Sequence, residues 1–172
     1  MAAALQPYIV DDYVCGLWKP EFLQGLLWRT AGNTLSRRIQ GHAPSWPWAS
    51  VTSEIKYGFG TLVEGGEWAQ QVDIEIKKTT ANPYGPAHGL VTLRGPLGVA
   101  VAEAIDSKWN SVSLRLDAEI YCKKAVMLVW YPDVTDEAGE GEKVHLFSVF
   151  TKRHSERHPE PEPFCLVLKQ TG

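Results

Sequence analysis

Three side chains that can donate hydrogen bonds are the candidate catalytic residues of this sequence. His42 directly precedes a turn rich in tryptophan, His88 lies in a loop before an apolar segment, and Arg94 ends that segment. A donor held beside a ligand carbonyl would draw electron density from it and so activate a conjugated system. Surface or strand-end contacts are the alternative interpretation of all three residues.

Six aromatic residues are candidate walls of a substrate site. The 172-residue chain has 7 tryptophans, and a tryptophan ring is seldom buried completely because its N–H requires a partner. The stretch APSWPWAS at 43–50 also contains two prolines, which make it a rigid turn. The predicted substrate-binding residues are Trp28, Trp46, Trp48, Tyr57, Tyr84 and Trp130. In the alternative interpretation, the first three fasten an N-terminal layer to a sheet.

The motifs of the common enzyme classes are absent from the sequence. It has no G-x-S-x-G elbow, Walker loop, G-x-G-x-x-G or C-x-x-C, so no nucleotide or metal cofactor is expected. His154 and His158 have a spacing that suits a metal on a helix, but their Glu/Pro-rich surroundings favour a solvated loop. Asp117 and Glu119 share one face of a predicted strand, where a solvent-facing side is favoured over acid–base chemistry.

The composition indicates one globular domain. With 44% hydrophobic and 22% charged residues, the chain is long enough to bury a substantial core. A net charge of −3 without basic clusters argues against a nucleic-acid partner, and the lack of a long apolar run argues against membrane insertion. Cys15, Cys122 and Cys165 suit free thiols in a reducing compartment, so a cytoplasmic location is expected. The sequence is compatible with either a monomer or a homo-oligomer.

Hydrophobic periodicity predicts a mainly β chain that begins with helices. The segments 11–18 and 19–30 are predicted to be two short helices, from an Asp cap in the first and helically spaced leucines after Pro20 in the second. Segment 125–131 is apolar on both faces and is predicted to be a central strand. The predicted strands are 71–78, 89–95, 97–104, 111–120, 125–131, 143–150 and 164–171.

The predicted architecture is an antiparallel β-barrel, or a tight sandwich, of about seven or eight strands with the two helices packed on it. This single domain, 1–172, would comprise a helical N-terminal layer (1–41), an aromatic turn (42–51) and the barrel (52–172). Small barrels of this kind often enclose a site for one apolar ligand.

Three groups of motifs resemble a known family. The chain resembles the C-terminal region of fungal heterokaryon incompatibility (HET) proteins in three segments. These are GLWKPEFLQGLLW (16–28), HAPSWPWASV (42–51) and NPYGPAHGLVTLRGPL (82–97). Pro47 stands where that family usually has serine. In the family an effector domain precedes this region, and here only ten residues precede Asp11. The resemblance therefore implies an accessory region that has either become inert or acquired a role of its own, without the family's signalling activity.

These features favour a cofactor-free cyclase or isomerase of fungal secondary metabolism. It would fold an apolar polyene or terpenoid-like substrate in a barrel pocket and promote an intramolecular cycloaddition, in the manner of a Diels–Alderase. Such chemistry needs no nucleophile, because holding the reacting carbons in place supplies much of the rate. The alternatives are a non-catalytic ligand-binding barrel and an interaction or regulatory module related to heterokaryon incompatibility.

Overall fold

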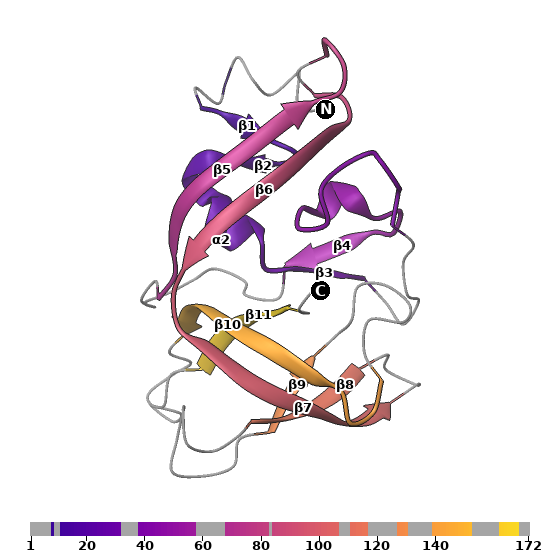
Figure 1. Cartoon of the computed structure of the whole chain (residues 1–172), viewed down its shortest axis with the longest axis vertical. Coiled ribbons are helices and arrows are strands. Elements are labelled where there is room, and N and C mark those ends of the chain that lie inside the picture. Colours follow the sequence, from indigo (N-terminus) through magenta and orange to yellow (C-terminus); the bar gives the residue numbers. More distant parts are fainter. Residues whose placement is uncertain are drawn as a thin grey trace.

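The computed structural model describes residue 8 and the ranges 11–31, 38–57, 68–82, 84–106, 111–116, 127–130, 139–152 and 162–168. Over these residues the chain is mainly β, with antiparallel strand pairs (Figure 1). The short N-terminal elements are β1 (Tyr13–Val14), β2 (Leu17–Trp18), η1 (Lys19–Glu21), α2 (Phe22–Gly25), β3 (Trp28–Thr30), η2 (Trp48–Ser50) and β4 (Ile55–Tyr57). The later strands are β5 (Gln70–Lys78), β6 (Ala87–Arg94), β7 (Leu97–Asp106), β8 (Ser111–Leu116), β9 (Met127–Trp130), β10 (Lys143–Lys152) and β11 (Glu162–Leu168).

Every predicted strand segment overlaps a strand of the structure. The clearest alternation forms β8, in which Leu114 is buried and its neighbour Arg115 is exposed, as the period of two requires. Within the described residues β8 ends at Leu116, and Asp117 and Glu119 lie outside them.

The helix predicted over 11–18 is wrong, because β1 and β2 form a β-hairpin there. Cys15 and Gly16 between the strands have φ values of 48° and 108°, and a two-residue turn with positive φ at both positions suits the right-handed twist of paired strands. Tyr13 pairs with Trp18, and their rings lie 5.3 Å apart, edge to face. The segment YVCGLW therefore has the pattern of a β-hairpin, with two apolar residues on each side of a turn that contains glycine.

The helix predicted over 19–30 is much shorter than expected. The η1 turn and α2 end at Gly25, and Trp28 then begins β3, which pairs with β4. A tryptophan and a threonine favour an extended chain at this point. A Cβ on Gly25 would lie 2.8 Å from Leu17 Cδ2, so the glycine lets α2 pack closely on β2.

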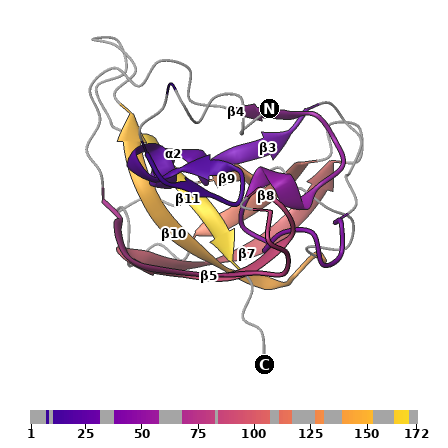
Figure 2. The ribbon, with the colours of Figure 1, turned by 90° about the horizontal axis from the view of Figure 1, so that it is seen from above.

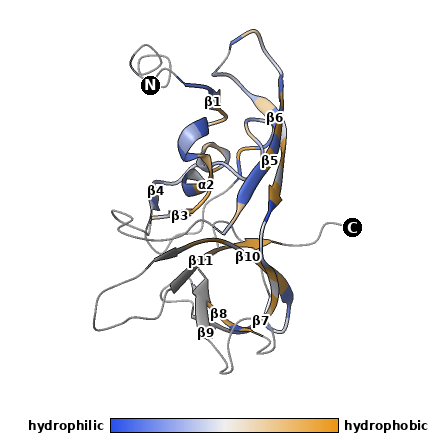
Figure 3. Cartoon of the chain, turned by 90° about the vertical axis from the view of Figure 1, so that its left-hand side faces the viewer, coloured by the Kyte–Doolittle hydropathy of each residue, from blue (hydrophilic) through white to orange (hydrophobic). Residues whose placement is uncertain are grey.

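The strands form one curled sheet and three two-stranded ribbons. The curled sheet has five strands in the order β11-β10-β7-β8-β9, and the ribbons are β1-β2, β3-β4 and β5-β6. In Figure 3 the sheet curls into an open half-barrel below the rest of the molecule. The described strands therefore do not form the predicted closed barrel of seven or eight strands, because β5 and β6 pair only with each other.

Backbone hydrogen bonds join the β5-β6 ribbon to the curled sheet at β10. The Trp68 N–H donates to the Val149 carbonyl at 2.9 Å, and the Ser148 N–H donates to the Pro96 carbonyl at 3.1 Å. A Cβ on Gly95 would lie 2.9 Å from the Phe147 ring, which explains the glycine where the chain passes from β6 to β7.

Strand β10 is buried on both faces. Val144 and Leu146 face the inside of the curled sheet, whereas Phe147 and Val149 belong to a second cluster on its other side. Among the described strands β9 lies at one edge of the curled sheet, so the prediction that 125–131 is a central strand is wrong. An apolar run in the sequence indicates burial, but it does not identify which strand separates two cores. In this structure β10 separates them, although it contains a histidine and a serine.

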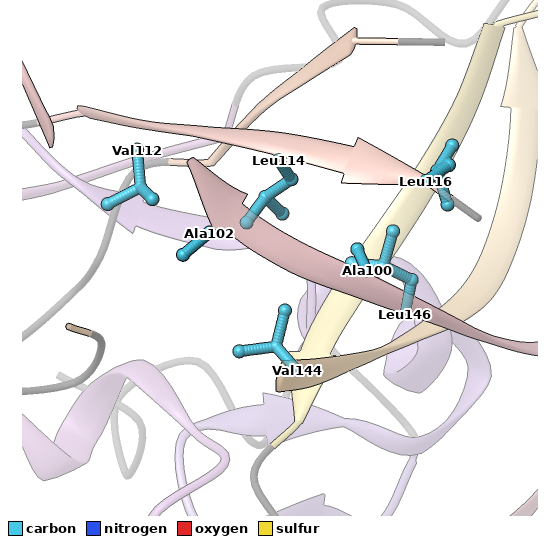
Figure 4. Packing of buried hydrophobic residues seen from close by; sticks show 7 residues of the cluster. All are labelled: Ala100, Ala102, Val112, Leu114, Leu116, Val144 and Leu146. Atoms are coloured by element: carbon cyan, nitrogen blue, oxygen red, sulfur yellow. The ribbon is translucent and has the colours of Figure 1, made fainter. Parts of the chain in front are cut away.

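Aliphatic side chains fill the inside of the curled sheet over its described part. The buried cluster comprises Ala100, Ala102, Val112, Leu114, Leu116, Val144 and Leu146 (Figure 4). They come from β7, β8 and β10. Because these side chains pack closely, they have a structural role in the described part of this interior.

The N-terminal elements pack as a layer on one face of the β5-β6 ribbon. Figure 2 shows α2 and β3 on one side of β5. The buried residues of this layer are Val14, Leu17, Phe22 and Leu26, and the ribbon contributes Ile74, Ile76, Val91 and Leu93. Val72 is 50% exposed although the alternation placed it on this face. The pairing shifts register between Gln71 and Asp73, so Val72 is the extra residue of a β-bulge.

Candidate functional site

The candidate site is a hollow where the N-terminal hairpin, the tryptophan turn and the β5-β6 ribbon meet. Its volume is about 60 Å³, below the roughly 300–1,000 Å³ of sites that enclose a whole small molecule. It can therefore hold one ring or one polar end of a ligand. Its lining residues are Tyr13, Cys15, His42, Ala43, Ala49, Ile76, Lys78, Tyr84, Gly85 and Ala87. We call it the Tyr13–Tyr84 hollow.

Two tyrosine rings form the aromatic part of this hollow. The rings of Tyr13 and Tyr84 lie 5.3 Å apart with planes at 61°, an edge-to-face arrangement. The Tyr84 N–H donates to Asn82 Oδ1 at 3.0 Å, which holds the loop between β5 and β6 in an Asx-type turn. Burial, with a smaller contribution from Cys15, raises the pKa of Tyr13. Its phenol therefore stays protonated and able to donate through the physiological range.

His42 and Lys78 bring polar groups to the same hollow. The His42 carbonyl accepts a hydrogen bond from the Ala87 N–H at 3.1 Å, which fastens the tryptophan turn to the start of β6. The exposed His42 side chain lines the hollow, and Lys78, at the end of β5, lines it from the ribbon. The residues that line this small space therefore include an imidazole, an ammonium and two phenols, all of which can donate hydrogen bonds.

Cys15 contributes a protonated thiol to the hollow. Burial raises its pKa, and the nearby Lys78 ammonium opposes this shift only in part. A thiolate is the nucleophilic form of cysteine, so a thiol with a raised pKa is a poor nucleophile near neutral pH. The Cys15 side chain therefore serves the hollow as a soft apolar surface.

The predicted tryptophans mostly lie beside the hollow rather than in it. The Trp28 indole donates to the Trp46 carbonyl at 2.9 Å, and the Trp46 ring packs edge to face on Phe22 at 5.4 Å. The Trp48 indole donates to the Gly16 carbonyl at 2.8 Å, although this residue is 37% exposed. These contacts fasten the turn to the N-terminal layer and to the hairpin that carries Tyr13.

The other predicted site residues lie elsewhere. His88 and Arg94 are exposed in β6 and lie on the face of the ribbon opposite Val91, which packs in the core. Tyr57 ends β4, 41% exposed. Trp130 ends β9, and its side chain lies outside the described residues. Of the predicted site residues whose side chains the structure describes, only His42 and Tyr84 come together in the hollow.

Sequence reasoning missed the three other lining residues with a polar or thiol side chain, namely Tyr13, Cys15 and Lys78. The first two were assigned to a helix, which concealed the hairpin that presents them. Lys78 continues the alternation of Ile74 and Ile76 and so lies on their face of β5, a signal that was present in the sequence.

The described residues provide neither a metal cluster nor a membrane-crossing helix. Among them, no group of three His, Cys, Asp or Glu side chains could hold a metal ion. No helix in that part of the chain has the length and apolar character needed to cross a bilayer. His154, His158 and Cys122 lie outside the described residues.

Comparisons of the chain with family models, curated proteins and solved structures found no match. The resemblance to the C-terminal region of HET proteins therefore stays a prediction, and the case for a function depends on the site itself.

Folding stability is expected to fall at alkaline pH. Burial raises the pKa of Tyr13, Cys15, Tyr57 and Cys165. The folded protein then keeps protons that the unfolded chain loses above the ordinary pKa values of 9.0 for a thiol and 10.0 for a phenol. Stability from these groups is complete below those values and is lost as pH rises through the raised ones.

Urea unfolding at a series of pH values tests this expectation. The contribution of these groups to the free energy of unfolding should be level up to about pH 9 and decline above it. In Tyr13→Phe the decline should be shallower, because one of the groups no longer titrates. An identical decline in the variant would contradict the burial assigned to Tyr13.

Proposed function

We propose that the protein is a cofactor-free cyclase or isomerase that binds one end of an apolar, conjugated small molecule in the Tyr13–Tyr84 hollow. The observation that carries the proposal is the convergence of two tyrosine rings and His42 on one hollow from three separate segments of the chain. Flat apolar surfaces with a few polar groups are typical of sites that orient small conjugated ligands. The rest of the substrate would lie across the neighbouring surface, since the hollow holds only part of it.

The reaction would be an intramolecular cycloaddition or a related ring closure. Two π bonds of the substrate are converted into two σ bonds between its own carbons, and no atom, proton or electron is gained or lost overall. Holding the two reacting segments close together removes much of the entropic barrier. This chemistry suits a site whose thiol is held in its non-nucleophilic form.

A donor in the hollow would add electrophilic activation. The Tyr13 hydroxyl, which is protonated at neutral pH, or the His42 imidazole would donate to a carbonyl conjugated with the reacting π system. Such a bond lowers the barrier if it strengthens as negative charge develops on the oxygen in the transition state. This role differs from the one predicted for Arg94 and His88, which lie on the other face of the ribbon.

The test is to incubate the purified protein with polyene substrates that carry a conjugated ketone and that also cyclise slowly without it. The protein should raise the rate and change the ratio of stereoisomeric products. Unchanged rates and ratios, with binding still detected, would identify a non-catalytic carrier. Unchanged rates without binding would remove the proposal for this substrate class.

A further inference from the structure

Strand β5 has one edge that is unpaired among the described strands. Its other edge pairs with β6 along the whole length of the strand. The Thr79 N–H donates to the Pro86 carbonyl across the ribbon, whereas the Ile74 N–H turns away from β6 and bonds the Asp73 carboxylate at 2.9 Å. Amide directions alternate along a strand, so the backbone groups of Ile74, Ile76 and Lys78 face the free edge.

Charge along this edge is arranged in two halves. The exposed acidic residues Asp73 and Glu75 come first, and the exposed basic residues Lys77 and Lys78 follow. Within the described part of the chain, neither Glu75 nor Lys77 takes part in an ion pair. A strand that is acidic in its first half and basic in its second half complements an antiparallel copy of itself.

We propose that β5 pairs antiparallel with β5 of a second copy of this chain, centred on Ile76. In this register Ile76 faces Ile76 of the second copy as a hydrogen-bonded pair, and Ile74 faces Lys78. Glu75 then lies opposite Lys77 of the second copy, and the two-fold axis repeats this pair. A register centred on Glu75 would place two glutamates opposite each other, so charge selects the first register.

Two local features define the extent of the seam. Pairing ends before Val72, because the bulge at Gln71–Asp73 interrupts the regular edge. The Ile74 amide exchanges the Asp73 carboxylate for the Lys78 carbonyl of the second copy. The seam therefore spans Ile74–Lys78 and forms about six backbone hydrogen bonds, two for each of its three hydrogen-bonded pairs.

Charge reversal and mixing test the seam by sedimentation equilibrium. The wild-type protein should dimerise, and E75K or K77E alone should each weaken dimerisation by about tenfold or more, because each creates two like-charge pairs. An equimolar mixture of E75K and K77E should regain dimers that contain one copy of each variant. In such a dimer both lysines of the E75K copy, at positions 75 and 77, face glutamates of the K77E copy. A loss of folding in either variant cannot produce this recovery.

E140K is the matched control, because Glu140 is exposed in the turn before β10. It carries the same change of charge and should leave dimerisation unaltered. A monomeric wild-type protein at the highest concentration measured would overturn the proposal. Failure of the E75K and K77E mixture to associate would overturn it as well.

Discussion

Replacing Phe22 by alanine is expected to lower the free energy of unfolding by about 3–5 kcal/mol. Phe22 is 1% exposed, and its ring packs edge to face on Trp46. Its cluster joins the N-terminal layer to the β5-β6 ribbon through Ile74 and Ile76. The substitution leaves a cavity where these elements meet, so we expect the loss to approach the upper part of the range. Urea denaturation followed by tryptophan fluorescence measures it.

The matched control is Leu90→Ala, at a large apolar residue that is 62% exposed on the outer face of the ribbon. Its effect should stay within about 0.5 kcal/mol, because little buried contact is removed. Phe22→Leu should fall between the two, since it keeps most of the apolar volume. If Phe22→Ala costs no more than Leu90→Ala, the N-terminal layer does not hold the hairpin on the ribbon as described.

Replacing Tyr13 by phenylalanine is expected to reduce turnover by about 100-fold while the protein stays folded. The substitution keeps the ring that contacts Tyr84 and Trp18 and removes only the hydroxyl. Loss of one donor to a developing oxyanion costs about 10²–10³ in rate in other enzymes. The effect should appear in kcat rather than in KM, because the bond strengthens in the transition state.

Tyr57→Phe is the control for this prediction. Burial raises the pKa of Tyr57 as it does that of Tyr13, but Tyr57 ends β4 and does not line the hollow. Its replacement should leave turnover unchanged. Equal losses in the two variants would mean that the tyrosines act through stability, and no loss in either would assign the donor to His42 or to another residue.

The sequence predicted the strands well, because a strand buried on one face alternates apolar and polar residues. This alternation can be recognised within a few neighbouring residues. Strand β8 and most of β5 follow this rule directly. The β5 bulge at Val72 depends on pairing with β6, which has no comparable local signal. The hairpin at Cys15 and Gly16 was mistaken for a helix because Asp11 and Asp12 resemble a helix cap, although the flanking apolar pairs favour a glycine turn.

The candidate site could be predicted only in part, because three distant segments build it. His42 was predicted from its position before the tryptophan turn, and Tyr84 as one of the aromatic candidates. Tyr13 reaches the hollow through a hairpin whose placement depends on the Trp48 bond to Gly16, 32 residues away in sequence. The tryptophan turn has a mainly structural role. Trp46 packs against the core, and the indoles of Trp28 and Trp48 donate hydrogen bonds to backbone carbonyls.

The most direct test of the Tyr13–Tyr84 hollow as the site of chemistry is turnover in a variant that fills it. Ala43→Phe places a ring in the hollow, whereas Ser45→Phe adds the same ring to an exposed position of the same turn. With a substrate that the wild-type protein cyclises, we predict that Ala43→Phe loses the rate enhancement and the product selectivity, and that Ser45→Phe keeps both. Full activity in a folded Ala43→Phe protein would contradict the assignment.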